Sequence, residues 1–91
     1  MATQRIFVSG RVQNVSFRDW TIRTAKRLGL IGWVRNTHDG RVEILADGED
    51  EAIGLLVDAC RDGPPLARVE HVTAVPDTAP PGKGFTKRFT A

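Results

Sequence analysis

The sequence predicts an α+β fold, a ferredoxin-like split βαβ sandwich in which an antiparallel sheet carries two helices on one face. Three observations lead to this prediction. The 91 residues suffice for a single domain, residues 1–91, with a thin core. Apolar residues alternate in four segments and recur with helical spacing in two others. These segments follow the order β-α-β-β-α-β, and a short terminal strand comes after them.

The first strand is expected over residues 5–12. One face of this strand would carry Ile6, Val8, Gly10 and Val12. A helix should begin after Ser16, which we expect to act as its N-cap, with Asp19 as the partner in a capping box. Gly29 is expected to end this helix, because glycine commonly follows the last helical residue.

The second strand is expected over residues 32–37, and a hairpin turn at residues 38–40 should lead into the third strand at residues 41–46. Asp47 and Gly48 then form a second turn. The acidic residues from Glu49 onward open the second helix. Its apolar stripe has the spacing of a buried helix face and consists of Ile53, Leu56, Val57 and Cys60.

Gly63 and the two prolines after it are expected to end the second helix. The fourth strand is expected over residues 67–75, and poor alternation around His71 indicates a bulge or a strong twist there. Residues 76–84 are rich in proline and glycine and predict a surface loop. A short last strand should follow at residues 85–89.

The charge and cysteine content exclude several classes of protein. Thirteen Lys and Arg against 11 Asp and Glu give a net charge of +2, which is too little for a dedicated nucleic-acid binder. The single cysteine, Cys60, excludes a disulfide framework and a thiolate zinc site. No apolar run approaches membrane-spanning length, and no signal peptide is visible after Met1. We therefore expect a soluble, cytoplasmic protein.

The segment of residues 10–18 is the strongest candidate for a binding site. A strand ends there, a short loop follows, and a helix begins, so successive N–H groups and the helix N-terminus can converge on an anion. Arg18 would bring a guanidinium to the same point. The alternative is a plain strand-to-helix connection in which Arg18 is merely solvated.

Asn36 stands at the end of the second expected strand. If this strand neighbours the first, Asn36 lies near the loop, and its side-chain amide could orient a water molecule. The simpler interpretation is that Asn36 terminates the strand by bonding to local backbone, as asparagine commonly does. The residues by themselves favour this simpler interpretation.

Three motifs resemble those of the acylphosphatase family. They read GRVQ-x-V-x-FR over residues 10–18, LGL-x-GWVRN-x-x-DG over residues 28–40, and GPP-x-A-x-V over residues 63–69. The resemblance extends from about Arg5 to Phe89, nearly the whole chain. It implies hydrolysis of the carboxyl–phosphate bond of small acyl phosphates, which yields a carboxylate and inorganic phosphate.

The resemblance also implies roles for individual residues. Backbone amides of the loop would cradle the phosphate, Arg18 would bind it, and Asn36 would hold the attacking water. The loop residues in question are Gln13, Asn14, Val15, Ser16 and Phe17. No metal or organic cofactor is implied. The expected partners are small acyl phosphates and inorganic phosphate, with no nucleic acid and no membrane, and the expected state is a monomer.

The chain departs from the family pattern at two positions. Asn14 stands where the family usually has glycine, and a tight anion loop requires a positive φ there, which asparagine tolerates. Lys87 stands where the last strand is usually apolar, so we expect this edge to be frayed or solvated. Neither change removes Arg18 or Asn36.

Two other classes of protein are compatible with the predicted order of elements. RNA-recognition modules share it, but the third expected strand, residues 41–46, lacks their aromatic residues. The other alternative is a small regulatory domain that binds anions without catalysis, which the departure at Asn14 favours.

Overall fold

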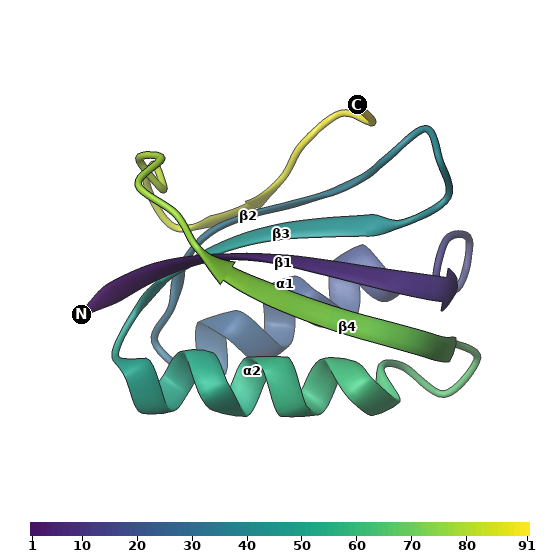
Figure 1. Ribbon diagram of the computed structural model, residues 1–91, viewed down its shortest axis with the longest axis horizontal. Helices are drawn as coiled ribbons and strands as arrows, with labels where there is room; N and C mark the ends of the chain where they lie inside the picture. The colour runs from purple at the N-terminus through teal and green to yellow at the C-terminus, as the bar shows by residue number, and fades with distance from the viewer.

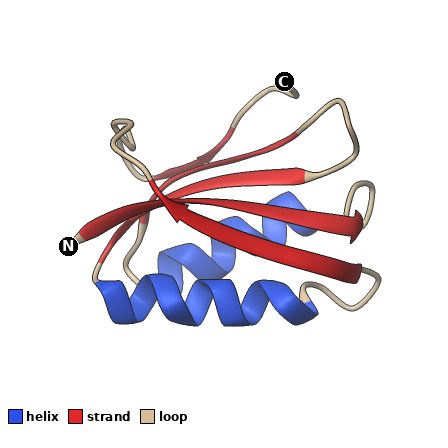
Figure 2. Cartoon of the chain, viewed as in Figure 1, coloured by secondary structure: helices blue, strands red, loops and turns tan.

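The computed structural model describes all 91 residues, and its elements follow the predicted order. Both helices pack against one face of a five-stranded sheet (Figures 1 and 2). The predicted α+β ferredoxin-like fold is confirmed. The elements are β1 (Ala2–Arg11), α1 (Phe17–Arg27), β2 (Ile31–Asn36), β3 (Val42–Gly48), α2 (Asp50–Asp62), β4 (Arg68–Pro76) and β5 (Phe85–Lys87).

The sheet is mixed rather than wholly antiparallel, which corrects the prediction. Its strand order is β4-β1-β3-β2-β5, and the first four strands are antiparallel to their neighbours. Strand β5 pairs with β2 in parallel. The chain reaches the β2 edge of the sheet beside the start of β2, where the Gly32 N–H donates to the Gly84 carbonyl at 2.9 Å. Strand β5 begins there and therefore runs in the same direction as β2.

The core lies between the helices and the face of the sheet that they cover. Alternate residues of β1 and β3 point into it, as their spacing predicts. The fully buried ones are Ile6, Val8, Val42, Ile44 and Ala46. Leu56 and Cys60 of α2 pack against them. Burial raises the pKa of the Cys60 thiol to about 12, so this cysteine is an inert core residue.

The start of β1 and the end of β3 differ from the sequence-based expectation. Ala2 pairs with Gly48 and Thr3 with Asp47, so both strands are longer than predicted. The expected turn at Asp47 and Gly48 is therefore wrong. The cross-strand pairing with β1 outweighs the local turn preference of these two residues.

The predicted irregularity near His71 is a β-bulge. Ser9 pairs with His71, but Gly10 pairs with Val69, so Glu70 is an extra residue on β4. Gly10 has a φ of 118°, and a Cβ there would lie 2.3 Å from the Arg68 carbonyl oxygen. Only glycine fits where the bulge brings the two backbones together, just before the loop that leaves β1.

The face of the sheet away from the helices is covered by arginine side chains over Trp33. The guanidinium carbons of Arg35 and Arg88 lie 4.7 Å from the centre of the Trp33 ring, and that of Arg5 lies at 5.5 Å. Glu43 of β3 is buried between Arg5 and Arg35 and forms ion pairs with both. Burial raises the pKa of Glu43, but these ion pairs outweigh it and hold the pKa below its usual value.

This covered face does not provide the base-stacking platform of an RNA-recognition module. The Trp33 side chain is buried beneath the guanidinium groups, and β3 contributes buried Glu43 and Leu45 instead of aromatic rings. Base stacking needs exposed aromatic faces. The structure therefore gives no support to the RNA-binding alternative.

Candidate active site

The loop between β1 and α1 alternates between left-handed and ordinary backbone conformations. Asn14 has a φ of 62° and Ser16 a φ of 63°, whereas Val15 between them has a negative φ. Such alternation turns successive N–H groups toward one side of the chain and forms a concavity for an anion. The expectation that Asn14 adopts a positive φ is confirmed.

The expected capping box at the start of α1 is wrong. Ser16 does occupy the N-cap position, but its side chain makes no capping hydrogen bond. A capping serine normally has an extended backbone, whereas the backbone of Ser16 is left-handed. Asp19 does not reach back to the cap either, because it forms an ion pair with Lys87 of β5.

Gln13 anchors this loop to the hairpin between β2 and β3, a role that the sequence did not reveal. Its side-chain amide donates to the Thr37 carbonyl at 2.8 Å and to the Arg41 carbonyl at 2.9 Å. The possibility that β2 neighbours β1 is wrong, because β3 lies between them. The two strands nevertheless end at the same edge of the sheet (Figure 1), and Gln13 bridges the gap.

A cavity of about 350 Å³, here called the loop cavity, opens at this edge of the sheet. Five of the predicted site residues line it, and Gln13 and Val15 do not. The lining residues are Val12, Asn14, Ser16, Phe17, Arg18, Asp19, Asn36 and Lys87. The structure thus brings Arg18 of α1 and Asn36 of β2 to one site, although they lie far apart in the sequence.

The side chains of Arg18 and Asn36 form no hydrogen bond or ion pair with another protein group. Both side chains are half-buried. The Asn36 carbonyl accepts a hydrogen bond from the Ala91 N–H at 3.1 Å, so the C-terminal segment binds its backbone. The interpretation that the Asn36 side chain terminates the strand by bonding local backbone is therefore wrong.

Lys87 and Asp19 form an ion pair at the mouth of the loop cavity. The Lys87 Nζ lies 2.6 Å from Asp19 Oδ1, and the two side chains are 42% and 56% exposed. The ammonium group holds the pKa of Asp19 below its usual value. The expectation of a solvated last strand is confirmed at Lys87, but the strand is not frayed, because Lys87 pairs in register with Val34.

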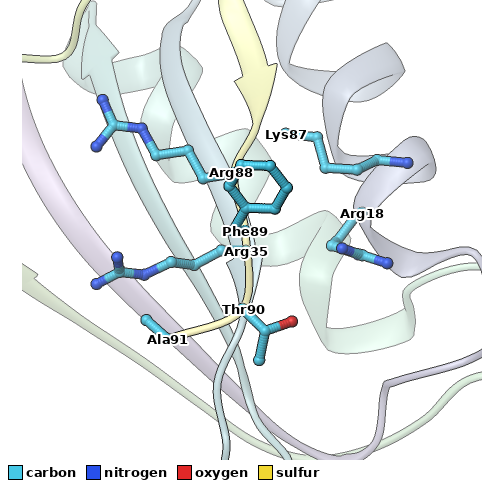
Figure 3. A pocket seen from close by; sticks show the side chains of 7 residues that line it. All are labelled: Arg18, Arg35, Lys87, Arg88, Phe89, Thr90 and Ala91. Atoms are coloured by element: carbon cyan, nitrogen blue, oxygen red, sulfur yellow. The ribbon is translucent and has the colours of Figure 1, made fainter.

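A second cavity of about 690 Å³, here called the C-terminal cavity, adjoins the first and shares Arg18 and Lys87 with it. Figure 3 shows that Arg18 and Lys87 extend toward one side of the C-terminal segment, whereas Arg35 and Arg88 extend toward the other. The four cations therefore do not converge. The remaining lining residues are Phe89, Thr90 and Ala91.

Gly63 links the third sequence motif to the loop. It has a φ of 66° at the end of α2, and a Cβ there would lie 2.7 Å from Cε2 of Phe17. Phe17 is buried and is the first residue of α1, directly before Arg18. Because Gly63 has no side chain, the Phe17 ring can pack against it. This packing holds the first residue of α1 in place.

No group of three or more His, Cys, Asp or Glu side chains is placed to hold a metal ion. No helix is long and apolar enough to cross a membrane. The side-chain donors that line the loop cavity are the guanidinium of Arg18, the ammonium of Lys87, the amides of Asn14 and Asn36 and the hydroxyl of Ser16.

A family model described as acylphosphatase matches residues 4–89. The chain belongs to the acylphosphatase family. It is 48% identical over 88 residues to an acylphosphatase of Rhodospirillum rubrum, covering 97% of each chain. It is 56% identical over 87 residues to one of Nitratidesulfovibrio vulgaris, covering 92% of this chain and 87% of the relative.

Solved structures agree with this assignment. A crystal structure of an acylphosphatase from Bacillus subtilis superimposes with a TM-score of 0.90 at 38% identity, covering 97% of this chain and 99% of that one. The family resemblance of the sequence motifs is thus confirmed, and the chain is an enzyme that hydrolyses acyl phosphates. This result favours catalysis over the alternative of a small regulatory domain that binds anions without catalysis.

Proposed function

We propose that the phosphoryl group of a small acyl phosphate binds in the loop cavity, held by backbone amides of residues 13–18 and by Arg18. One observation carries this proposal. The loop with its alternating backbone conformation, the Arg18 guanidinium and the Asn36 amide line the same cavity, and neither of these two side chains has a protein partner. Each is a donor suited to an anion or to water.

The charges at the site suit a phosphate dianion. The N-terminus of α1 contributes the equivalent of about half a positive charge, and Arg18 in its first turn adds a full one. A guanidinium can donate two parallel hydrogen bonds to two phosphate oxygens, which fixes the orientation of the group as well as its position. The loop and Arg18 would thus align the phosphorus for attack.

Asn36 is proposed to orient the attacking water from the end of β2. The water oxygen forms a bond to phosphorus while the bond between phosphorus and the acyl oxygen breaks. The carboxylate leaves with the bonding electron pair, and a phosphate oxygen accepts the proton of the water. A carboxylate is a good leaving group, so positioning and charge stabilisation suffice without a strong general acid. We propose that no metal ion takes part.

The acyl group would extend into the C-terminal cavity, which shares Arg18 and Lys87 with the loop cavity. This cavity is larger and is bordered by Phe89 and Thr90. The cavity can therefore accept acyl groups of different size, and we expect acyl phosphates that differ only in this size to bind with similar affinity. A cytoplasmic location and a monomeric state remain predictions.

The role of Arg18 can be tested by steady-state kinetics on acetyl phosphate or benzoyl phosphate in the presence of a metal chelator. Arg18→Ala should lower kcat/KM by about 10²–10³, the usual effect of removing a charge-stabilising donor. Arg18→Lys should restore little, because an ammonium cannot bind two oxygens in a fork. Arg27→Ala, an exposed position at the other end of α1, is the matched control. Near-normal activity of Arg18→Ala would refute this assignment, and loss of activity with the chelator would refute metal independence.

The role of Asn36 is tested by separating turnover from phosphate binding. Asn36→Ala should lower kcat strongly but leave the inhibition constant of inorganic phosphate nearly unchanged, because the side chain contacts water rather than phosphate. If the affinity for phosphate falls in step with kcat, Asn36 is a phosphate ligand or a structural residue instead.

A further inference from the structure

The ion pair between Lys87 and Asp19 joins the edge strand β5 to the first turn of α1, at the mouth of the loop cavity. Both residues line that cavity, and the ammonium lies 2.6 Å from the carboxylate. Figure 3 shows Lys87 extending on the same side of the C-terminal segment as Arg18. The pair therefore stands beside the group proposed to bind phosphate.

Asp19 is the only carboxylate side chain that lines the loop cavity, and it directly follows Arg18 in the chain. An unpaired carboxylate in this position would oppose phosphate binding in two ways. It would repel the dianion directly, and it would compete with the phosphate for the guanidinium of Arg18. In the structure Asp19 pairs with Lys87, and Arg18 forms no ion pair with this carboxylate.

We propose that Lys87 is a positioning residue for phosphate binding, which holds and neutralises Asp19 so that Arg18 remains free for the phosphoryl group. This inference rests on the proposed role of Arg18. The pKa of Asp19 lies below its usual value chiefly because of the hydrogen bond from Lys87, which agrees with this pairing.

Lys87 could instead contact the substrate directly, since it also lines the C-terminal cavity. The geometry favours the indirect role, because the ammonium is already engaged by a carboxylate at hydrogen-bonding distance. The two roles predict different results when Asp19 is neutralised. If Lys87 acts only on Asp19, its removal has no consequence once the carboxylate is gone.

A double-mutant cycle measures this difference through the inhibition constant of inorganic phosphate. Lys87→Met keeps the length of the side chain and removes its charge, and it should weaken phosphate inhibition by about fivefold, the upper range for an exposed pair. Asp19→Asn should retain or strengthen inhibition. In the double variant inhibition should return to within about twofold of the unmodified protein. Lys83→Met, exposed and outside both cavities, is the matched control.

The rescue by Asp19→Asn distinguishes positioning from a merely structural effect, because a misfolded edge strand would not recover when Asp19 changes. Equal weakening by Lys87→Met in both backgrounds would make Lys87 a direct ligand and overturn the inference. An unchanged inhibition constant in Lys87→Met would overturn it as well. Arg18→Ala, measured in parallel, separates the two proposals. If it loses phosphate affinity while Lys87→Met does not, only the inference about Lys87 fails.

Discussion

The left-handed conformation of Asn14 allows a quantitative test of the loop. Asn14 has a φ of 62°, its side chain is exposed, and it makes no hydrogen bond. An uncharged substitution there changes the cost of the backbone conformation and the lining of the loop cavity, but it removes no hydrogen bond. Asn14→Val should lower the free energy of unfolding by about 1–2 kcal/mol, because a β-branched residue is strongly disfavoured at positive φ.

Asn14→Gly should change the free energy of unfolding by no more than about 1 kcal/mol, because two effects oppose each other. Glycine adopts positive φ without strain, but it loses more conformational entropy on folding. For a domain of this size, 1 kcal/mol corresponds to about 4–8 °C in Tm. The Val variant should therefore melt well below the Gly variant, whereas the Gly variant should melt near the unmodified protein.

Thermal unfolding and titration with inorganic phosphate together provide the assay. If Asn14→Val keeps its fold by relaxing the loop, phosphate affinity should fall by about five- to thirtyfold, which corresponds to the same 1–2 kcal/mol. Asn14→Asp is the control, because aspartate also tolerates positive φ, so stability should hold while its negative charge weakens phosphate binding. Equal Tm and equal phosphate affinity for the Val and Gly variants would refute the left-handed loop as the phosphate cradle.

Three further predictions concern stability. Gly63→Ala should lower the free energy of unfolding by about 2 kcal/mol or more, since it combines a φ of 66° with a clash against Phe17, and denaturant unfolding would reveal this loss. Thr24→Val should raise the free energy of unfolding by about 1 kcal/mol, because the buried Thr24 Oγ1 has no partner, whereas Thr21→Val should lower it similarly by removing a 2.8 Å hydrogen bond to the Phe17 carbonyl. Arg41 and Thr37 lower the pKa of Asp39 from 3.8 to about 2. The stability that this carboxylate contributes is therefore present above about pH 4 and is lost as the pH falls toward 2. Asp39→Asn should flatten that part of the profile of unfolding free energy against pH.

Several features of the fold could be predicted from the sequence because they depend on residues that are neighbours in the chain. Alternating apolar residues define the strands, and the spacing from Ile53 to Cys60 defines the buried face of α2. The positive φ at Asn14 is what the resemblance implies, because the family usually has glycine at this position of the loop. The bulge near His71 follows from the break in alternation.

Local chemistry also misled in two places. Ser16 and Asp19 have the spacing of a capping box, but the loop needs a left-handed Ser16, and Asp19 finds a stronger partner in Lys87. Asp47 and Gly48 have the composition of a turn, but the first residues of β1 extend the sheet across them. In both cases a contact with a distant segment outweighs a preference of only a few tenths to about 1 kcal/mol.

The sequence by itself determined the order of the elements and the family, and the resemblance to that family singled out Arg18 and Asn36 as candidate site residues. Only the tertiary structure decided the parallel direction of β5, the anchoring of the loop by Gln13 and the pairing of Lys87 with Asp19. Periodicity and turn-forming residues depend on neighbours in the chain, so the helices, strands and turns they define can be predicted from the sequence. Which distant side chains meet depends on the strand order of the open sheet and on how the helices pack against it, and local patterns do not report either.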